Sequence, residues 1–153
     1  MSAVDAEGVA LVTGANSPIG AAIAQRLAAA GAKGVLGAHR ETDRGEPLAA
    51  DLGAPMLVAD LADPSSAKRL GDETVKVAGQ LDVLVNTAGY ERLTPILQDG
   101  REVEDVFRRI VDVNILGTYY VTREAVQKMG AGSRIVITAS VWGKTGMGGF
   151  SAY

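Results

Sequence analysis

The sequence predicts a protein of the α/β class, with a doubly wound parallel sheet that helices cover on both faces. Three observations support this prediction. Short apolar runs alternate with segments of helical periodicity along the chain. No hairpin signal joins neighbouring runs, which is typical of strand–helix–strand units and of a parallel sheet. Polar or glycine-containing turns follow several of the runs, where sheets of this kind bind their ligands.

The apolar runs are short and mostly continuous, as expected of strands that are buried on both faces. Right-handed crossovers between such strands predict the order 3-2-1-4-5 in one sheet. We expect a single domain over residues 1–153, with functional residues just beyond the carboxyl ends of the strands. The strands are expected at residues 9–13, 34–38, 56–59, 81–85 and 134–138.

Helical segments connect the expected strands. The third begins at Asp63 and Pro64, a capping residue followed by a residue suited to a first helical turn. The fourth is the longest, and Asn114 lies on or near its apolar face, although asparagine is a poor residue inside a helix. We therefore expect Asn114 to have an internal polar partner. The helices are expected at about residues 19–30, 45–52, 64–79 and 103–129.

Composition excludes several classes of function. The chain of 153 residues is 47% hydrophobic and 22% charged, which is ordinary for one folded domain. A net charge of -3 gives no basic surface for nucleic acid. With no cysteine and one histidine, neither a disulfide framework nor a metal site is expected. No apolar run is long enough to cross a membrane, so the default location is cytoplasmic.

The turn after the first expected strand has the features of a phosphate-binding turn. Two glycines let the backbone approach a pyrophosphate, and the helix that follows offers N–H groups and the positive end of its dipole. The alternative is an ordinary tight turn between a strand and a helix. The candidate cofactor-binding residues of this turn are Thr13, Gly14, Asn16, Ser17, Ile19 and Gly20.

The residues after the second expected strand bear on which dinucleotide binds. Sites that prefer NAD usually place an acid here to bond the ribose 2′-hydroxyl. This chain has His39 and Arg40 instead. Because the planar guanidinium matches phosphate oxygens, Arg40 favours NADP(H) over NAD(H). The alternative is a solvated surface arginine.

The end of the sequence holds the most specific pattern. Ser140 follows the fifth expected strand, and Tyr153 follows it thirteen residues later within Ser-Ala-Tyr. With the first turn and the Asn-Thr-Ala-Gly turn at 86–89, this pattern resembles the short-chain dehydrogenase/reductase family, from about residue 8 to 153. The first turn departs from the family at Pro18, where a glycine is expected, and the second departs mildly at Thr87.

The resemblance implies a Rossmann-like nucleotide-binding domain with further cofactor contacts. Asp60 would bond the adenine amino group, although it could equally cap a turn. Leu61 would help to line that pocket, and the 86–89 turn would border the ribose. Asn114 would hold a water in a proton relay, unless it makes a structural hydrogen bond to a neighbouring strand. The remaining cofactor-binding candidates are His39, Arg40, Asp60, Leu61, Asn86, Ala88 and Gly89.

The resemblance also assigns the chemistry. Hydride transfer to a ketone builds negative charge on its oxygen, which needs hydrogen-bond donors and finally a proton. Ser140 would polarise the carbonyl and Tyr153 would donate the proton. A free tyrosine has a pKa of about 10, and the family lowers it with a lysine four residues further on. Position 157 lies beyond this sequence.

We therefore expect an NAD(P)(H)-dependent oxidoreductase that interconverts a carbonyl and a secondary alcohol, with 3-oxoacyl thioester reduction as one possible subtype. The chain is expected to be C-terminally incomplete, to lack the family's last two strands, and to be inactive by itself. Residues 135–137 would then form an exposed apolar edge that invites aggregation.

Two alternatives stay open. One is a lyase on the same fold, similar to the halohydrin dehalogenases, and the other is a nucleotide-binding remnant without catalysis. The partners expected are a small carbonyl or alcohol substrate and, in the full-length form, further copies of the chain. Helix residues Glu104, Arg108 and Arg109 are expected to form a solvated face, and the loop around Trp142 either borders a substrate or packs locally.

Overall fold

A computed structural model describes residues 8–38 and 45–153 of the chain. Its five strands form one parallel sheet in the order β3-β2-β1-β4-β5, which confirms the predicted topology. The third strand is shorter than expected, because residues 58 and 59 lie outside it. The strands are β1 Gly8–Thr13, β2 Ala32–Ala38, β3 Met56–Leu57, β4 Val83–Asn86 and β5 Arg134–Ile137.

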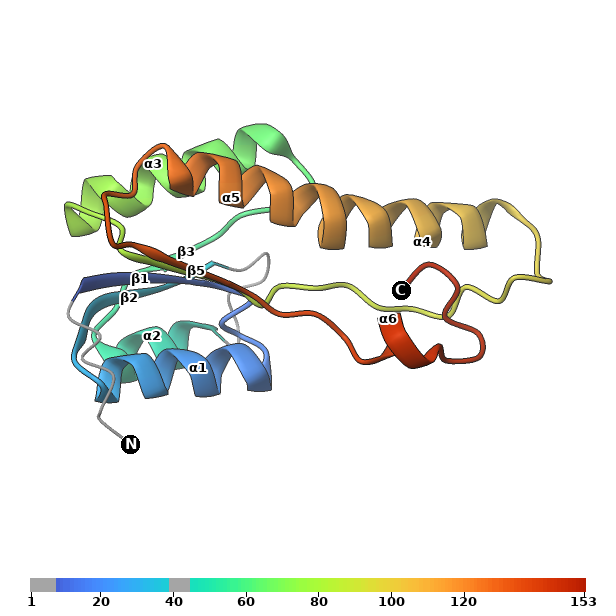
Figure 1. Cartoon of the computed structure of the whole chain (residues 1–153), viewed down its shortest axis with the longest axis horizontal. Helices are drawn as coiled ribbons and strands as arrows, with labels where there is room; N and C mark the ends of the chain where they lie inside the picture. The colour runs from blue at the N-terminus through green and yellow to red at the C-terminus, as the bar shows by residue number, and fades with distance from the viewer. Residues whose placement is uncertain (1–7, 39–44) are drawn as a thin grey trace.

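The helices form a layer on each face of the sheet (Figure 1). Helices α1 and α2 cover one face, α3 and α5 cover the other, and α4 extends past the ends of the strands. The short helix α6 and the C-terminus lie at the end of the molecule toward which α4 extends. The helices are α1 Pro18–Ala29, α2 Gly45–Leu52, α3 Pro64–Ala78, α4 Arg101–Val111, the π-helical segment η1 Asp112–Gly117, α5 Thr118–Val126 and α6 Trp142–Thr145.

The central strand β1 shows why the fold has two helix layers. Successive side chains of a strand point to opposite faces. Val9 and Leu11 join the buried cluster beneath α3 and α5, whereas Ala10 and Val12 join the cluster on the side of α1. Because both faces are apolar, β1 requires a cover on each side.

The long helical pattern of the sequence is interrupted by η1 between α4 and α5. Periodicity predicted one unbroken helix, and the π-helical turn is a departure from it, of a kind often found at functional sites. Gly117, at its end, packs closely on the Asp60–Leu61 corner. A Cβ at position 117 would lie 3.0 Å from the Leu61 carbonyl oxygen, so a larger residue there would push the helix away.

Beyond η1, charged side chains join α5 to α3. Glu124 is buried, and its carboxylate pairs with Arg123 at 2.9 Å. Lys128, one turn later, pairs with Asp72 of α3 at 3.0 Å. Hydrogen bonds from Lys68 and Lys128 hold the pKa of Asp72 below its ordinary value. The Lys128–Asp72 pair ties the end of the α5 segment to α3, whereas the Arg123–Glu124 pair lies within α5.

The carboxyl ends of β1 and β4 are joined by one buried hydroxyl. Thr13 Oγ1 accepts hydrogen bonds from the backbone N–H groups of Thr87, at 3.1 Å, and Ala88, at 3.2 Å. The Thr13 side chain is fully buried. Beside it, Gly14 has φ +68°, and a Cβ there would lie 2.7 Å from the Ala88 Cα atom. Only glycine allows the two turns to pack backbone against backbone.

Strand β5 is the outermost strand of the sheet among the described residues. Its apolar side chains remain accessible: Ile135 is 39% exposed, Val136 51% and Ile137 56%. The expectation of an exposed apolar edge is therefore confirmed for the chain as described.

The Thr13 junction predicts a measurable cost in stability. Thr13→Val keeps the shape of the side chain but leaves two backbone N–H groups without an acceptor. We expect the free energy of unfolding to fall by about 1–3 kcal/mol in chemical denaturation. Thr74→Val is the matched control, since Thr74 is also fully buried and donates to the Leu70 carbonyl oxygen. That carbonyl keeps its helical hydrogen bond, so an equal loss in both variants would contradict the prediction.

The exposed edge predicts self-association of this chain. A lysine on an edge strand opposes pairing with another strand. We expect Val136→Lys to lower the concentration-dependent association seen in sedimentation velocity. Val77→Lys on α3 is the control, because Val77 is 50% exposed but is not part of an edge. A wild-type chain that stays monomeric at all concentrations would contradict this expectation.

Candidate functional site

The candidate site lies at the carboxyl ends of β1 and β4, at the point where the strand order reverses. From β1 the chain crosses to β2 on one side and β4 lies on the other, so the two turns that follow β1 and β4 diverge. Doubly wound sheets bind ligands at such a point. The structure brings Thr13, Gly14 and Ala88 together here through the junction described above.

The turn from β1 into α1 is compact. A Cβ on Gly20 would lie 2.2 Å from the Gly14 carbonyl oxygen, so this crossing also requires glycine. Ser17 caps α1, and its Oγ accepts the Gly20 N–H at 3.1 Å. Pro18 is the first residue of the helix and has no N–H to offer.

Two further residues of this turn remain accessible to a ligand. Ile19 lies in the first turn of α1, where a backbone N–H has no partner within the helix. The residue is 61% exposed. Asn16 is half-buried in the same turn. A helix start with an available N–H group is suited to an anion.

Asn86, the last residue of β4, carries a buried polar atom with spare capacity. Its Nδ2 donates to Thr122 Oγ1 at 2.9 Å. Its Oδ1 is buried and has no hydrogen-bond partner among the described residues. Buried acceptors are nearly always satisfied, so this unpaired oxygen at the end of β4 is unusual. Gly89, three residues on, is exposed.

Asp60 lies just beyond β3 and is held by several groups. Arg109 of α4 donates from Nη2 to both carboxylate oxygens, at 2.9 and 3.1 Å. The Ala62 N–H donates to Oδ1 at 3.1 Å. The expectation that Arg109 belongs to a solvated face is therefore wrong, because its side chain is only 30% exposed and paired.

The Leu61 side chain is largely buried, and its role in lining the cofactor pocket stays a prediction. It is 8% exposed and belongs to the buried cluster between the sheet and the α3 and α5 layer. Sequence spacing could not distinguish core packing from contact with a ligand, because a side chain just after a strand can point into the core or toward the ligand site. His39 and Arg40 lie outside the described residues, so the NADP(H) preference stays a prediction.

Asn114 has the internal polar partner that its position in the helix required. It lies in η1, its Oδ1 accepts the Tyr90 N–H at 2.7 Å, and its Nδ2 donates to the Tyr90 carbonyl at 2.9 Å. The partner is thus the backbone of the segment after β4, not a strand. Asn114 holds this segment against the long helix.

Trp142 contacts Ser140 through its backbone and Tyr153 through its ring. Ser140 Oγ accepts the Trp142 backbone N–H at 3.2 Å, a local turn contact. The Trp142 ring meets the Tyr153 ring edge-on with 5.8 Å between centroids, and packs on Phe150 at 5.0 Å. Tyr153 is 38% exposed. Sequence reasoning left open whether Trp142 packs locally, and here it does.

The segment before Tyr153 is anchored to the loop that precedes α4. The Thr94 N–H donates to the Gly149 carbonyl at 2.7 Å, and the Ala152 N–H donates to Thr94 Oγ1 at 3.0 Å. The Ser151 hydroxyl donates to the Thr94 carbonyl. Thr94 is buried, and these contacts hold the end of the chain beside α4.

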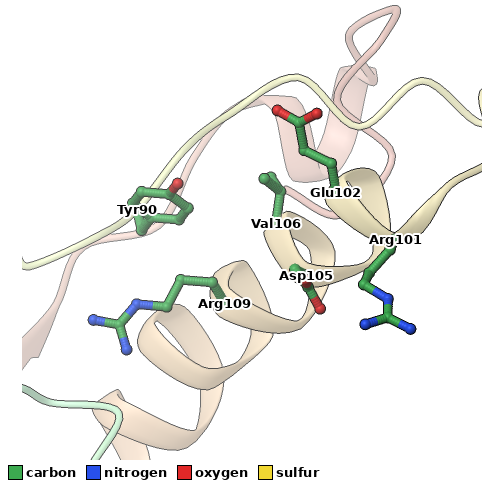
Figure 2. Close-up of a pocket in the computed structure, with 6 residues that line it drawn as sticks. All are labelled: Tyr90, Arg101, Glu102, Asp105, Val106 and Arg109. Atoms are coloured by element: carbon green, nitrogen blue, oxygen red, sulfur yellow. The ribbon is translucent and has the colours of Figure 1, made fainter.

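A cleft of about 570 Å³ opens between α4 and the segment after β4 (Figure 2). In Figure 2 Arg109 extends toward the end of the cleft where Tyr90 lies, while Arg101 lies at the other end. Neither Tyr90 nor Arg109 was marked by sequence motifs. The lining residues are Tyr90, Arg101, Glu102, Asp105, Val106 and Arg109.

The described residues were also compared with what a metal site and a membrane-spanning helix require. In residues 8–38 and 45–153, no group of three or more histidine, aspartate or glutamate side chains is placed to hold a metal ion. No helix in the described part of the chain is both long and apolar enough to cross a membrane.

Comparison with known proteins places this geometry in a family. A ketoacyl reductase named for the granaticin polyketide synthase of Streptomyces violaceoruber is 40% identical over 134 residues, covering 86% of this chain and 54% of that protein. Versicolorin reductase 1 of Aspergillus parasiticus is 37% identical over 137 residues, covering 86% of this chain and 51% of that protein. The chain thus spans about half the length of these curated relatives.

Solved structures agree. A short chain dehydrogenase from Burkholderia cenocepacia in complex with NADP superposes with a TM-score of 0.85 at 30% identity, covering 97% of this chain and 61% of that one. The family model for short chain dehydrogenases matches residues 8–153. The chain therefore belongs to the short-chain dehydrogenase family of oxidoreductases.

Proposed function

We propose that this chain is the nucleotide-binding and catalytic part of an NADP(H)-dependent oxidoreductase that interconverts a carbonyl and a secondary alcohol. The observation that carries the proposal is the glycine crossing at the end of β1. Gly14 lies against the Ala88 backbone and Gly20 against the Gly14 backbone, at the point where the strand order reverses. This is the kind of site where a dinucleotide lies against backbone and not against side chains.

The described residues fit a dinucleotide. The Ile19 N–H at the start of α1 suits a phosphate oxygen, and the α1 dipole adds to the attraction. The backbone of Ala88 and of the exposed Gly89, which Asn86 precedes, suits a ribose hydroxyl. Asp60 suits the adenine amino group, because a carboxylate is an acceptor and the amino group is a donor.

When bound, the nicotinamide supplies or takes up a hydride. The side chains of this chain would handle the oxygen and its proton. Ser140 would donate a hydrogen bond to the carbonyl oxygen without changing its own charge, and Tyr153 would donate and then give up the proton.

Asn114 supports this chemistry in our proposal. Its two bonds to the Tyr90 backbone use one donor and one acceptor position of the amide. An amide has two positions of each kind, so Asn114 has the capacity to hold a water in a proton relay as well.

The substrate class follows from the family and its relatives. We infer a small ketone or secondary alcohol, and the printed names of both relatives, a ketoacyl reductase and a versicolorin reductase, support reduction of a ketone. A 3-oxoacyl thioester is one subtype. We also infer that the whole protein is a homo-oligomer, which the exposed apolar side chains of the long helix support; these include Phe107, Ile115, Leu116 and Tyr119.

NADPH binding tests the cofactor assignment. Trp142 is the one tryptophan of the chain, and NADPH absorbs where tryptophan emits, so binding is followed by energy transfer. Gly20→Ala places a methyl group against the Gly14 carbonyl, and we expect affinity to fall by about tenfold or more. Gly130→Ala, whose added methyl meets open space, is the matched control. Equal affinity in all three proteins, at equal unfolding midpoints, would refute the assignment.

Turnover tests the chemistry in the whole protein. We expect Tyr153→Phe to lower kcat for ketone reduction by about 10²–10⁴-fold, because it removes the proton donor, while NADPH affinity stays within about twofold. Nicotinamide oxidation is followed by absorbance. If Tyr153→Phe turns over like wild type, the proton-donor role is wrong. If wild type releases halide from a halohydrin without binding NADPH, the lyase alternative replaces this proposal.

A further inference from the structure

The ion pair between Arg109 and Asp60 joins two parts of the chain that are 49 residues apart. Asp60 follows β3 at the carboxyl edge of the sheet, and Arg109 lies in the last turns of α4. One guanidinium nitrogen contacts both carboxylate oxygens, at 2.9 and 3.1 Å. Contact with both oxygens limits rotation of the carboxylate as well as its position.

The Asp60 carboxylate is also held from its own turn. The Ala62 N–H donates to Asp60 Oδ1. The Asp60 backbone is fixed as well, because its N–H donates to Ser66 Oγ at 3.1 Å. The Asp60 side chain nevertheless remains 39% exposed and the Arg109 side chain 30% exposed. The carboxylate is thus oriented by the protein and still accessible to a ligand.

The long helical segment from α4 through η1 contacts both Asp60 and the segment that carries Tyr90. Arg109 holds Asp60, while Asn114, one π-helical turn further on, holds the Tyr90 backbone. Gly117 packs on the Leu61 backbone and keeps the same corner against the helix. Tyr90 and Arg109 then line the same cleft (Figure 2).

We propose that Arg109 is a positioning residue for recognition of the adenine base. It acts through Asp60, by holding that carboxylate where it accepts a hydrogen bond from the adenine amino group. The inference rests on the proposed dinucleotide function and adds to it a residue that no motif of the chain marked. A purely structural ion pair would alter stability, but it would not alter the choice between two bases.

The experiment therefore compares two ligands. NADPH carries the adenine amino group, and its hypoxanthine analogue carries an oxygen in that place. The dissociation constants of both are measured by titration calorimetry for wild type and variants. We expect wild type to bind NADPH about tenfold more tightly, the effect of one hydrogen bond to a charged group. Arg109→Gln should bring the ratio of the two constants close to one.

Control variants separate this role from general damage. Arg108→Gln removes the neighbouring arginine, which is exposed and lines a different cleft, and should keep the wild-type ratio. Asp60→Asn should lose the preference as Arg109→Gln does, and the double variant should lose nothing further. Arg109→Lys keeps the charge and should restore part of the preference, which covers the case in which Arg109→Gln does not fold.

The outcomes are distinct. If wild type binds neither ligand, the proposed dinucleotide function itself fails. If wild type binds both ligands equally, NADPH binding stands but the adenine role of Asp60 and Arg109 is wrong. If Arg109→Gln weakens both ligands by the same factor, or keeps the tenfold preference, Arg109 is structural only and the inference is overturned.

Discussion

The junction at Thr13 is the contact on which the rest of the site depends. One buried hydroxyl accepts the N–H groups of Thr87 and Ala88, and so couples the ends of β1 and β4 at the strand-order reversal. Because Gly14 lies directly against Ala88, the two turns cannot shift independently. This coupling fixes the glycine turn relative to the end of β4. It thereby also fixes the start of α1 relative to Asn86. A backbone surface held in this way needs little rearrangement to receive a rigid ligand.

The long helix organises the other side of the site. In an unbroken α-helix, residues three or four apart lie on the same face. Residues 109 and 114 are five apart, so they would point in different directions in such a helix. The π-helical turn at η1 changes that phase, at a point where Asn114 reaches the Tyr90 backbone and Gly117 reaches Leu61. The departure from regular helix is thus tied to the contacts that hold Asp60 and Tyr90.

Local patterns predicted well wherever a short segment decides its own structure. Asp63 caps its helix and Pro64 opens it, as their residue types predicted. The strand order followed from handedness rules that do not depend on side-chain detail. Arg109 could not be found in this way. Its role depends on a partner 49 residues away, and a charged residue in a polar helix pattern is usually solvated.

The sequence by itself determined the fold class, the order of the strands, the glycine turn and the family, because each depends on local periodicity, on turn chemistry or on residues in a set order. Only the tertiary structure decided where the candidate side chains lie and what they contact. It buried Leu61 in the core, paired Arg109 with Asp60 and packed the Trp142 ring against Tyr153. Those outcomes depend on how distant segments pack, and packing is set by the whole sheet and its helices rather than by any one segment.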